Sequence, residues 1–571
     1  MNIKINNNAY WANPGETILQ VAQREGIKIP TLCYIADLTP SGACRICMVE
    51  LSNGQLVPSC AYPVSDGMEV LSNSKKVRRS RKSIIELLIA NHPQDCLVCV
   101  RNGCCDLQDL AAEYGVRSYR YVGEKRSGKL DLASPAVERD PEKCILCGRC
   151  VRMCHEVQNV GAIDFVDRGF YSNVAPAMNR SLNTTACVYC GQCIVACPVG
   201  ALREKSYLKQ AWEAINDPDV HVIAQVAPAV RVAIGEEFGM APGTITTGKI
   251  PAALRRIGVD EIFDTNFAAD LTIMEEANEL IDRLKNGGKL PMFTSCSPGW
   301  IKYVEHFYPE LFDNISTCKS PQGMQGAMIK SYYAQKKGID PAKIFVLSIM
   351  PCTAKKFEAG RPELSVTHTA PDVDVVISTR EFARMMRLAG IDFTRMPDEG
   401  FDDPLGEATG AGALFGTSGG VMEAALRTAH FMITGKDMDR IDFTSIRGLE
   451  GVKESSIKIG NATLKVAAVS GLHNIDKFLE DVKSGKSEFH FIEVMACPGG
   501  CINGGGQPLP SSPEKIKKRM EAIYEVDRSL PKRCSHYNDS INALYDTFLG
   551  KPGGKKSHEL LHTHYFKRES I

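Results

Sequence analysis

Apolar residues follow different periods in different parts of this chain. Near the N-terminus, residues 3–5 and 10–12 alternate with the period of a β-strand, and residues 17–25 form a short amphipathic pattern that Gly26 closes. Residues 77–90 continue with a helical pattern. These elements predict a small sheet with one helix, followed by a second helix.

From residue 206 onward the pattern becomes that of an α/β protein. Continuous apolar runs at residues 221–226 and 343–348 are typical of buried strands, and helical patterns of 10 to 15 residues separate such runs. We expect a compact α/β body of two lobes here. Its longest apolar stretch, residues 220–235, is interrupted by Arg231 and is shorter than the roughly 18 to 20 residues that cross a bilayer, so no membrane anchor is predicted.

Composition narrows the classes of protein and partner. A chain of 571 residues is long enough for several domains. Lysine plus arginine equals aspartate plus glutamate at 67 each, so no net field favours a nucleic acid or an anionic membrane. The N-terminal residues lack the apolar core and cleavage site of a secretion signal, which predicts a cytoplasmic protein whose partners are small molecules or other proteins.

The 22 cysteines are the strongest chemical signal. A reducing cytosol keeps thiols reduced, so clustered cysteines there indicate metal binding rather than disulfides. They are dense in the first 200 residues and sparse afterwards. This asymmetry predicts an N-terminal electron relay in front of a separate C-terminal body.

The first group of cysteines offers thiolates, the soft ligands that iron-sulfur clusters need. Its C-x10-C-x2-C-x12-C spacing differs from the plant-type ferredoxin pattern, and a structural zinc site is the alternative. A second group combines one imidazole with thiolates, and it too could bind either an iron-sulfur cluster or zinc. Cys104, beside this group, is interpreted first as a spare thiol and second as an alternative ligand. The two groups are Cys33, Cys44, Cys47 and Cys60, then His92, Cys96, Cys99 and Cys105.

A duplicated cysteine run follows, and it has the spacing of bacterial two-cluster ferredoxins. In such runs the fourth cysteine of each run binds the cluster of the other run. The runs are therefore assigned crosswise, one 4Fe-4S cluster to Cys144, Cys147, Cys150 and Cys197, and another to Cys187, Cys190, Cys193 and Cys154. Successive cluster sites predict that residues 1–205 form an electron-transfer chain, and such a chain implies a terminus with which it exchanges electrons.

Three motifs in the C-terminal body point to a family. They are Thr-Ser-Cys-Ser-Pro-Gly-Trp at residues 294–300, Met-Pro-Cys-Thr-Ala-Lys-Lys-Phe-Glu at 350–358, and Glu-Val-Met-Ala-Cys-Pro-Gly-Gly-Cys-Ile-Asn-Gly-Gly-Gly-Gln-Pro at 493–508. Together they resemble the active-site signatures of FeFe-hydrogenases. The first two cysteine groups in turn resemble the 2Fe-2S and His/Cys3 4Fe-4S modules of hydrogenases and of the large peripheral subunit of respiratory complex I. The resemblance covers nearly the whole chain.

The resemblance implies an active site, the H-cluster, in which a 4Fe-4S cluster shares a cysteine with a two-iron unit. That unit bears carbon monoxide, cyanide and a dithiolate with a pendant amine. By resemblance, Cys352, Cys497 and Cys501 hold the 4Fe-4S half, Cys501 is the bridge, and Lys355 donates to one cyanide. Ala229 replaces a serine of some family members, which removes a hydrogen bond to the other cyanide. The remaining pocket residues implied are Pro228, Gln322, Met350 and Met495.

Ser297 is the largest departure from the family pattern, which often has a cysteine ligand of iron at this position. Cys296 matches the neighbouring family cysteine that relays protons to the pendant amine. Serine is a poor ligand for an iron-sulfur cluster because its oxygen is hard and its hydroxyl resists deprotonation. Three resolutions stay open: Ser297 binds as an alkoxide, Cys296 becomes the ligand, or another thiol moves in. Cys318 is the thiol available for the third, although a stray cysteine is first interpreted as a small buried apolar residue.

The helical pattern of residues 273–285 carries a further set of polar candidates. Glu276, Glu279 and Arg283 share one face of this helix, opposite its apolar positions. From the pattern alone, this face is predicted to be an exposed, salt-bridged surface. The resemblance instead implies that protons pass from Arg283 through Glu279, Ser316 and Glu276 to Cys296, provided that burial raises the pKa of the carboxyl groups.

Other motifs carry less weight. Residues 410–415 lack the third glycine of a dinucleotide fingerprint and residues 416–420 lack a P-loop lysine, so no nucleotide site is predicted and a tight turn into a helix near Val421 is expected instead. The spacing of His558, His562 and His564 is weak evidence for a metal site, and a solvated helix end is expected there.

The sequence therefore predicts an α+β multidomain protein. Its expected parts are a 2Fe-2S ferredoxin-like β-grasp domain (residues 1–78), a His/Cys3 4Fe-4S domain (79–122), a bacterial ferredoxin-like domain with two 4Fe-4S clusters (123–205) and a two-lobed α/β hydrogenase domain (206–571). The predicted cofactors are one 2Fe-2S cluster, three accessory 4Fe-4S clusters and the H-cluster.

The predicted function is reversible conversion of H2 to protons and electrons. Electrons would pass through the accessory clusters to ferredoxin or to flavin- and NAD-binding partner subunits, and maturation proteins would load the two-iron unit. One alternative is the catalytic subunit of an electron-bifurcating complex linked to NAD and ferredoxin. A second is a non-catalytic hydrogen sensor or iron-sulfur assembly protein, which Ser297 keeps open.

Overall fold

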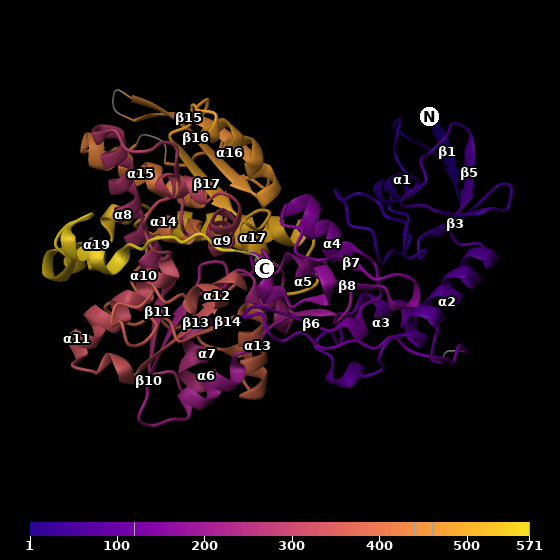
Figure 1. Ribbon diagram of the computed structural model, residues 1–571, viewed down its shortest axis with the longest axis horizontal. Coiled ribbons are helices and arrows are strands. Elements are labelled where there is room, and N and C mark those ends of the chain that lie inside the picture. Colours follow the sequence, from indigo (N-terminus) through magenta and orange to yellow (C-terminus); the bar gives the residue numbers. More distant parts are fainter. Residues whose placement is uncertain (119, 439–440, 460–461, 570–571) are drawn as a thin grey trace. The chain divides into compact units, whose positions relative to one another are not determined.

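The computed structural model describes residues 1–118, 120–438, 441–459 and 462–569. The chain folds into two compact units, whose elements are labelled in Figure 1. Unit 1 consists of Met1–Glu156, Gly161–Thr185 and Gln192–Arg203, and unit 2 consists of Val157–Val160, Ala186–Gly191 and Glu204–Ile571. The α+β multidomain fold predicted from the sequence is confirmed.

Unit 1 begins with a mixed sheet in the strand order β2-β1-β5-β3-β4. The buried residues of helix α1 (Ile18–Arg24) pack into the same apolar core as Ile3 and Ile5. Thr17 starts this helix with a capping box, because its hydroxyl accepts from the Gln20 amide while the Gln20 side chain accepts from the Thr17 amide. The strands are β1 (Asn2–Ile5), β2 (Asn8–Trp11), β3 (Met48–Leu51), β4 (Leu56–Pro58) and β5 (Met68–Leu71).

The rest of unit 1 consists of short elements joined by loops. In the loop before α4, Leu146 (φ 54°) and Gly148 (φ 68°) have left-handed backbone, which turns the chain tightly around one cavity. The helices are α2 (Lys75–Ala90), α3 (Asp106–Glu113), α4 (Arg149–Arg152) and α5 (Gln192–Ala196). The strands form two pairs, β6 (Val137–Arg139) with β9 (Leu202–Glu204) and β7 (Asp164–Val166) with β8 (Asn173–Ala175).

The first sheet of unit 2 is parallel throughout and has the order β11-β10-β13-β14. Its central strands β10 (His221–Val226) and β13 (Ile344–Met350) are buried along most of their length, which explains their continuous apolar sequences. Both strands were predicted from those runs and are confirmed. The edge strands are β11 (Glu261–Asp264) and β14 (Val375–Ser378).

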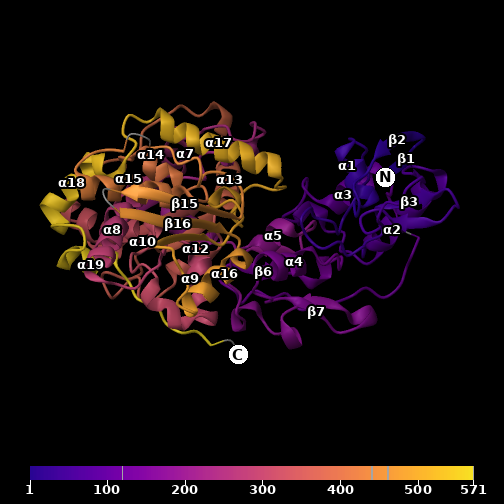
Figure 2. The ribbon, with the colours of Figure 1, turned by 90° about the horizontal axis from the view of Figure 1, so that it is seen from above.

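The second sheet of unit 2 has the order β12-β17-β16-β15. β17 (Phe491–Met495) runs parallel to β12 (Met292–Phe293) and to β16 (Ala462–Ser470). β15 (Val452–Ile459) is an antiparallel edge strand, and it lies beside β16 in both Figure 1 and Figure 2. The two sheets account for the two lobes expected of this body.

Helix α8 (Thr265–Asn286) is the longest helix in the part of the chain that the structure describes, and most of it is buried. It packs against α10 (Pro321–Met328), α14 (Gly410–Leu414) and α15 (Gly420–Thr434). Glu276 on this helix is fully buried, and the side chains of Glu279 and Arg283 are only 14% and 12% exposed. The predicted salt bridge is present, since Arg283 pairs with Glu279 at 2.6 Å. The prediction that this face is exposed is wrong, because neighbouring elements cover the polar side of the helix as well as its apolar side.

A buried ion pair fastens the start of α8 to the loop after β10. Arg231 donates to both carboxylate oxygens of Asp264, at 3.0 and 2.7 Å, and its Nε donates to the Pro228 carbonyl at 3.2 Å. Asp264 also caps α8 by accepting from the Asn266 amide at 2.9 Å. The arginine that interrupts an apolar stretch of the sequence thus neutralises a buried carboxylate.

The C-terminal helices α17 (Pro513–Ser529), α18 (Asp539–Leu544) and α19 (Lys555–Leu561) complete unit 2. His562 follows α19, and its side chain is only 5% exposed, with Nδ1 2.7 Å from the Thr317 hydroxyl and Nε2 3.1 Å from Glu275. The expected solvated helix end is therefore wrong at this histidine, because the Thr563 amide donates to the Thr317 carbonyl and holds the tail against the body. Among the helices that the structure describes, none combines the length and apolar character needed to cross a membrane.

Candidate active site

A cavity in unit 2 lies where strands of both sheets end. β10 leads directly to Pro228 and β13 to Cys352, while β12 is soon followed by Cys296 and β17 by Cys497. Loops that leave the carboxyl ends of parallel strands gather at one edge of a sheet. The strand order therefore brings distant parts of the sequence to one place.

The walls of this cavity are mainly apolar. Cys318 does not line it, but lies in a hydrophobic core with its Sγ 3.8 Å from Glu279 Oε2. The residues predicted to surround the active cluster line the cavity together, namely Pro228, Cys296, Ser297, Gln322, Met350, Cys352, Lys355, Met495, Cys497 and Cys501.

Cysteine thiols supply the soft donor atoms of this cavity. Burial raises the pKa of Cys352 and raises that of Cys501 to about 12, so these thiols need a bound cation to hold them deprotonated. The backbone approaches closely, because a Cβ on Gly504 would lie 2.3 Å from the Pro351 carbonyl oxygen. The thiol donors and the close backbone fit an iron-sulfur cluster.

Lys355 is held at the cavity wall by two groups that the sequence did not single out. Its Nζ donates to the Glu358 carboxylate at 2.8 and 3.0 Å and to Ser320 Oγ at 2.6 Å. Gln322 Nε2 donates to the same carboxylate at 3.2 Å, and its Oε1 accepts from Ser348 Oγ at 2.9 Å. The Lys-x-x-Glu spacing was the available signal, but such pairs are also common on exposed helices.

Ser297 and Cys296 both have their side chains at the cavity. Ser297 is the residue before helix α9 (Pro298–Phe307), and its Oγ accepts from the Ala496 amide at 3.3 Å instead of capping the helix. Burial and the nearby carboxyl group of Glu276 raise the pKa of the Cys296 thiol well above its ordinary value. Of the three resolutions for the missing ligand, two use these residues, whereas Cys318 would have to leave its hydrophobic core.

A chain of polar side chains leads from the end of α8 towards the cavity. Arg283 Nη2 donates to Glu279 Oε1 at 2.6 Å, and Ser316 Oγ donates to Glu279 Oε2 at 2.7 Å. Further along, Glu276 Oε1 accepts from the Ser295 amide at 3.4 Å. These residues belong to the proton path that the resemblance implied, and Arg283, Glu279 and Ser316 contact one another in the implied order.

Glu276 is the most perturbed carboxyl group of this chain of contacts. Within the described residues its Oε2 has no hydrogen-bond partner. Burial and the neighbouring charge of Glu279 raise the pKa of Glu276 to about 8. A carboxyl group with this pKa changes its protonation state near neutral pH, so it can take up and release protons there.

In unit 1 the first cysteine group comes together as predicted for a single site. The Cys33 thiol lies within hydrogen-bonding distance of Cys44 and Cys60, and the Cys47 thiol within that distance of Cys60. In the second group, His92 has a buried Nδ1 without a hydrogen-bond partner in the described part of the chain. A buried ring nitrogen without a partner, on a half-buried histidine, suits a metal ligand.

The duplicated cysteine run is divided by the structure. Cys154 and Cys193 belong to unit 1, whereas Cys187 and Cys190 belong to the Ala186–Gly191 segment of unit 2, where Cys190 lines the cavity described above. The other crosswise set lines one cavity of unit 1, formed in part by Cys144, Cys147, Cys150 and Cys197.

Cysteine groups with these spacings, together with a cysteine-lined cavity in an α/β body, define an iron-sulfur oxidoreductase. Residues 220–505 match the family described as iron only hydrogenase large subunit, C-terminal domain, and residues 513–568 match the iron hydrogenase small subunit. The chain belongs to the iron-only, or FeFe, hydrogenase family.

The N-terminal residues match iron-sulfur families rather than zinc-binding ones. Residues 1–75 match a 2Fe-2S iron-sulfur cluster binding domain, and residues 81–120 match the NADH-ubiquinone oxidoreductase-G iron-sulfur binding region. Residues 134–203 match the ferredoxin-like domain of NADH-quinone oxidoreductase subunit 3. The protein thus carries 2Fe-2S and 4Fe-4S clusters besides the active cluster of its family.

Individual relatives extend over the whole chain. The NADP-reducing hydrogenase subunit HndD of Solidesulfovibrio fructosivorans is 49% identical over 570 residues, covering 98% of this chain and 97% of the relative. Iron hydrogenase 1 of Clostridium pasteurianum is 41% identical and covers 99% of this chain and 100% of its own length. The solved FeFe-hydrogenase HydA1 from Chlamydomonas reinhardtii superposes with a TM-score of 0.58 at 44% identity, covering 64% of this chain and 99% of its own. The predicted hydrogenase function is confirmed, in preference to a sensor or assembly protein.

Proposed function

We propose that hydrogen is cleaved and formed in the cavity of unit 2, with Cys352, Cys497 and Cys501 as ligands of the 4Fe-4S part of the active cluster. The convergence of these cysteines with Cys296 and Lys355 on one apolar cavity carries the proposal. When bound, the active cluster supplies the iron site at which H2 reacts. The surrounding side chains bind it, orient it and exchange protons with it.

Lys355 would bind an anionic ligand of the cluster, such as cyanide. Glu358 and Ser320 fix its ammonium group, so the N–H donors are already oriented when the cluster arrives. Met350, Met495 and Pro228 keep water away, and the polarisable thioethers suit a gap beside metal carbonyls. Gln322, anchored by Ser348, completes the polar side of the pocket.

At the fourth ligand position, Ser297 and Cys296 are the groups that reach the cavity. The hydrogen bond from the Ala496 amide would stabilise a Ser297 alkoxide on iron. Cys296 then stays available as the thiol that passes protons to the cluster. This combination retains hydrogenase chemistry with altered tuning of the cluster.

Protons travel between solvent and Cys296 through Arg283, Glu279, Ser316 and Glu276. Glu279 contacts both Arg283 and Ser316 directly, and small side-chain movements would carry the proton from Ser316 to Glu276 and on to Cys296. Glu276 Oε2 has an unused lone pair with which to accept the next proton.

The pH dependence of turnover follows from Glu276. Its pKa of about 8 is raised, so Glu276 is protonated below that pH and ionised above it. Hydrogen evolution uses the protonated form as donor, and its rate should fall about tenfold per pH unit above pH 8. Hydrogen uptake uses the ionised form as acceptor and should fall correspondingly below pH 8. Both rates can be followed with an artificial dye between about pH 6 and 10, and identical profiles in wild type and Glu276→Gln would contradict this assignment.

Electrons enter and leave through accessory clusters on the N-terminal cysteines. We assign a 2Fe-2S cluster to the first cysteine group, a 4Fe-4S cluster to the His92 group, and one 4Fe-4S cluster to each crosswise set of the duplicated run. Clusters with several ligand types give graded reduction potentials along such a series.

Removing the His92 imidazole tests the second cluster. His92→Ala should lose about four iron atoms per chain, because three thiolates hold a 4Fe-4S cluster less firmly than four ligands do. Iron analysis and electron paramagnetic resonance of the anaerobically purified variant would measure the loss. Cys104→Ala is the matched control, and a loss of iron in this control but not in His92→Ala would exchange the roles of the two residues.

The physiological electron partners are flavin- and NAD(P)-binding subunits together with ferredoxin. The name of the HndD relative and the likeness of residues 81–120 and 134–203 to NADH oxidoreductase modules support this proposal. We place the protein in the cytoplasm of its host. Anaerobic affinity purification from that host should recover flavoprotein subunits together with the chain, and the purified complex should reduce NADP⁺ with H2. Recovery of the chain alone, with full activity towards ferredoxin, would favour a stand-alone enzyme.

Infrared spectroscopy tests the active site directly. The chain, loaded by maturation proteins and held under H2, should show carbonyl and cyanide stretching bands together with dye-linked hydrogen uptake. Cys501→Ala should lose both the bands and the uptake while keeping the iron of unit 1. Wild-type protein with intact accessory clusters but neither bands nor uptake would refute the proposed site.

A further inference from the structure

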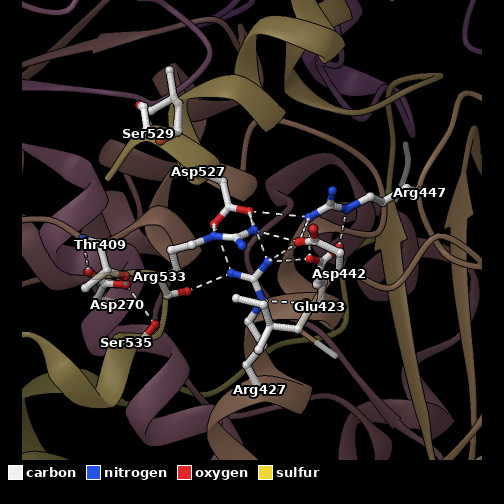
Figure 3. Close-up of polar contacts among 12 residues, drawn as sticks. Asp270, Thr409, Glu423, Arg427, Asp442, Arg447, Asp527, Ser529, Arg533 and Ser535 are labelled. Carbon is white, nitrogen blue, oxygen red and sulfur yellow. Dashed lines mark hydrogen bonds and ion pairs between the residues drawn. The ribbon is translucent and has the colours of Figure 1, made fainter. Parts of the chain in front are cut away.

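The C-terminal segment of unit 2 is fastened to helix α15 by a buried cluster of charges (Figure 3). Asp527 accepts from Arg427 at 2.9 and 3.0 Å, and from Arg533 and Arg447. We call this set the ion cluster, and it consists of Glu423, Arg427, Asp442, Arg447, Asp527 and Arg533. Its three arginines balance its three acids, so the ion cluster itself has no need of a cation.

Next to the ion cluster lies a second group of different chemistry. Asp437 follows the end of α15, and Cys534 and His536 follow α17, directly after Arg533 of the ion cluster. One ligand atom from each of these side chains lies within 4.8 Å of the other two. None of them belongs to the cavity or to the cysteine groups of unit 1.

The ring of His536 is oriented as metal-binding imidazoles are. Its Nδ1 lies 3.3 Å from the Thr428 hydroxyl, which leaves Nε2 to face Asp437 Oδ1 at 3.3 Å. Phe431 stacks on the ring with 4.1 Å between centroids and fixes its plane. Metal-bound histidines characteristically use their second nitrogen in such a supporting hydrogen bond.

The other two proposed donors are the carboxylate of Asp437 and the thiol of Cys534. Tyr537 donates to Asp437 Oδ2 at 2.8 Å, which holds the carboxylate and leaves Oδ1 towards the histidine. Cys534 is 6% exposed, and its thiol has no hydrogen-bond partner among the described residues. The Asp437 side chain is 47% exposed, so water can reach the open side of the group.

We propose that Asp437, Cys534 and His536 bind a divalent transition-metal ion of the zinc class, with water as the fourth ligand. Sulfur, imidazole nitrogen and carboxylate oxygen are the donors that Zn²⁺ takes in proteins, about 2.0 to 2.3 Å from the metal. Such bonds place the donors of a tetrahedral ion about 3 to 4 Å apart, a contraction that small side-chain rotations supply. The ion then cross-links the end of α15 to the segment after α17.

The test uses the full cluster-loaded enzyme, dialysed against a chelator and then given Zn²⁺. Zinc K-edge absorption, which iron does not obscure, should show one sulfur at about 2.3 Å and nitrogen or oxygen at about 2.0 Å. Cys534→Ala and Asp437→Asn should weaken zinc binding about 100-fold or more, and Thr428→Val, which removes only the supporting hydroxyl, about tenfold. Cys104→Ala should bind zinc as the wild type does.

Two results would overturn the proposal. Equal zinc affinity in wild type, Cys534→Ala and Asp437→Asn would exclude these ligands. A zinc spectrum with three or four sulfurs would place the ion in an incompletely loaded iron-sulfur site. Hydrogen uptake should be the same in all these variants, which separates this site from the hydrogenase site. Should Cys534→Ala fail to fold because Cys534 is buried, the exposed Asp437 still provides the decisive variant, Asp437→Asn.

Discussion

Replacing Glu276 by glutamine is expected to lower hydrogen turnover by a factor of about 10² to 10⁴ in both directions. Glutamine keeps the size of the side chain and can still accept from the Ser295 amide, so the helix and the cavity stay in place. It cannot exchange a proton at the buried Oε2 position, and the path from Glu279 to Cys296 is interrupted there. Dye-linked assays on protein with measured iron content would give the loss.

Glu275→Gln is the matched control for this experiment. Glu275 neighbours Glu276 on α8 and is equally buried, but it accepts from Ser557 and Gly553 and faces His562 instead of the polar chain. We expect its substitution to cost stability and to leave turnover within a few-fold of wild type. Similar losses of hydrogen turnover in Glu276→Gln and Glu275→Gln would mean that Glu276 acts by supporting the fold. Protons would then have to pass through other residues.

Replacing Arg231 by methionine is expected to destabilise unit 2 by about 3 to 5 kcal/mol. The substitution fills similar space but leaves the Asp264 carboxylate buried without its bidentate partner. It also frees the Pro228 carbonyl, so the wall of the cavity loses an anchor. Urea unfolding followed by the fluorescence of the buried Trp300 would measure the change.

The double variant Arg231→Met/Asp264→Asn separates the charge from the packing. Asparagine keeps the cap on α8 and removes the unpaired charge, so most of the lost stability should return. A double-mutant cycle with Asp264→Asn alone gives the coupling between the two residues. If Arg231→Met were as stable as wild type, solvent would have to reach Asp264, and the burial of this ion pair would be in question.

Local patterns predicted the central strands well because buried parallel strands need continuous apolar sequence. The runs at residues 221–226 and 343–348 became β10 and β13 for this reason. The exposure of the polar face of α8 was predicted wrongly. Periodicity separates the polar from the apolar positions of a helix, but it does not show which elements pack over the polar positions. Arg231 illustrates the same limit, since its partner Asp264 lies far along the sequence.

Motifs predicted the residues of the cavity, but they did not predict how those residues are held. Lys355 was implied by its motif, whereas its contact with Ser320 depends on two segments meeting only in the fold. His562 was expected to be exposed to solvent because the residues around it in the sequence give no sign of its contacts with Glu275 and Thr317. Contacts of this kind are set by tertiary packing, which a single sequence does not encode locally.

The order in which the cavity is completed during synthesis has consequences for how the enzyme matures. Its walls come from segments as far apart as Cys190 and Gly504, so no ribosome-bound chain can complete this cavity before Gly504 has emerged. The first cysteine group is complete once Cys60 has been made. Unit 1 can therefore begin to acquire iron and sulfur while translation continues, whereas the active cluster must be inserted into a finished fold. Cells that lack the maturation proteins would accumulate a protein that has its accessory clusters but does not react with hydrogen.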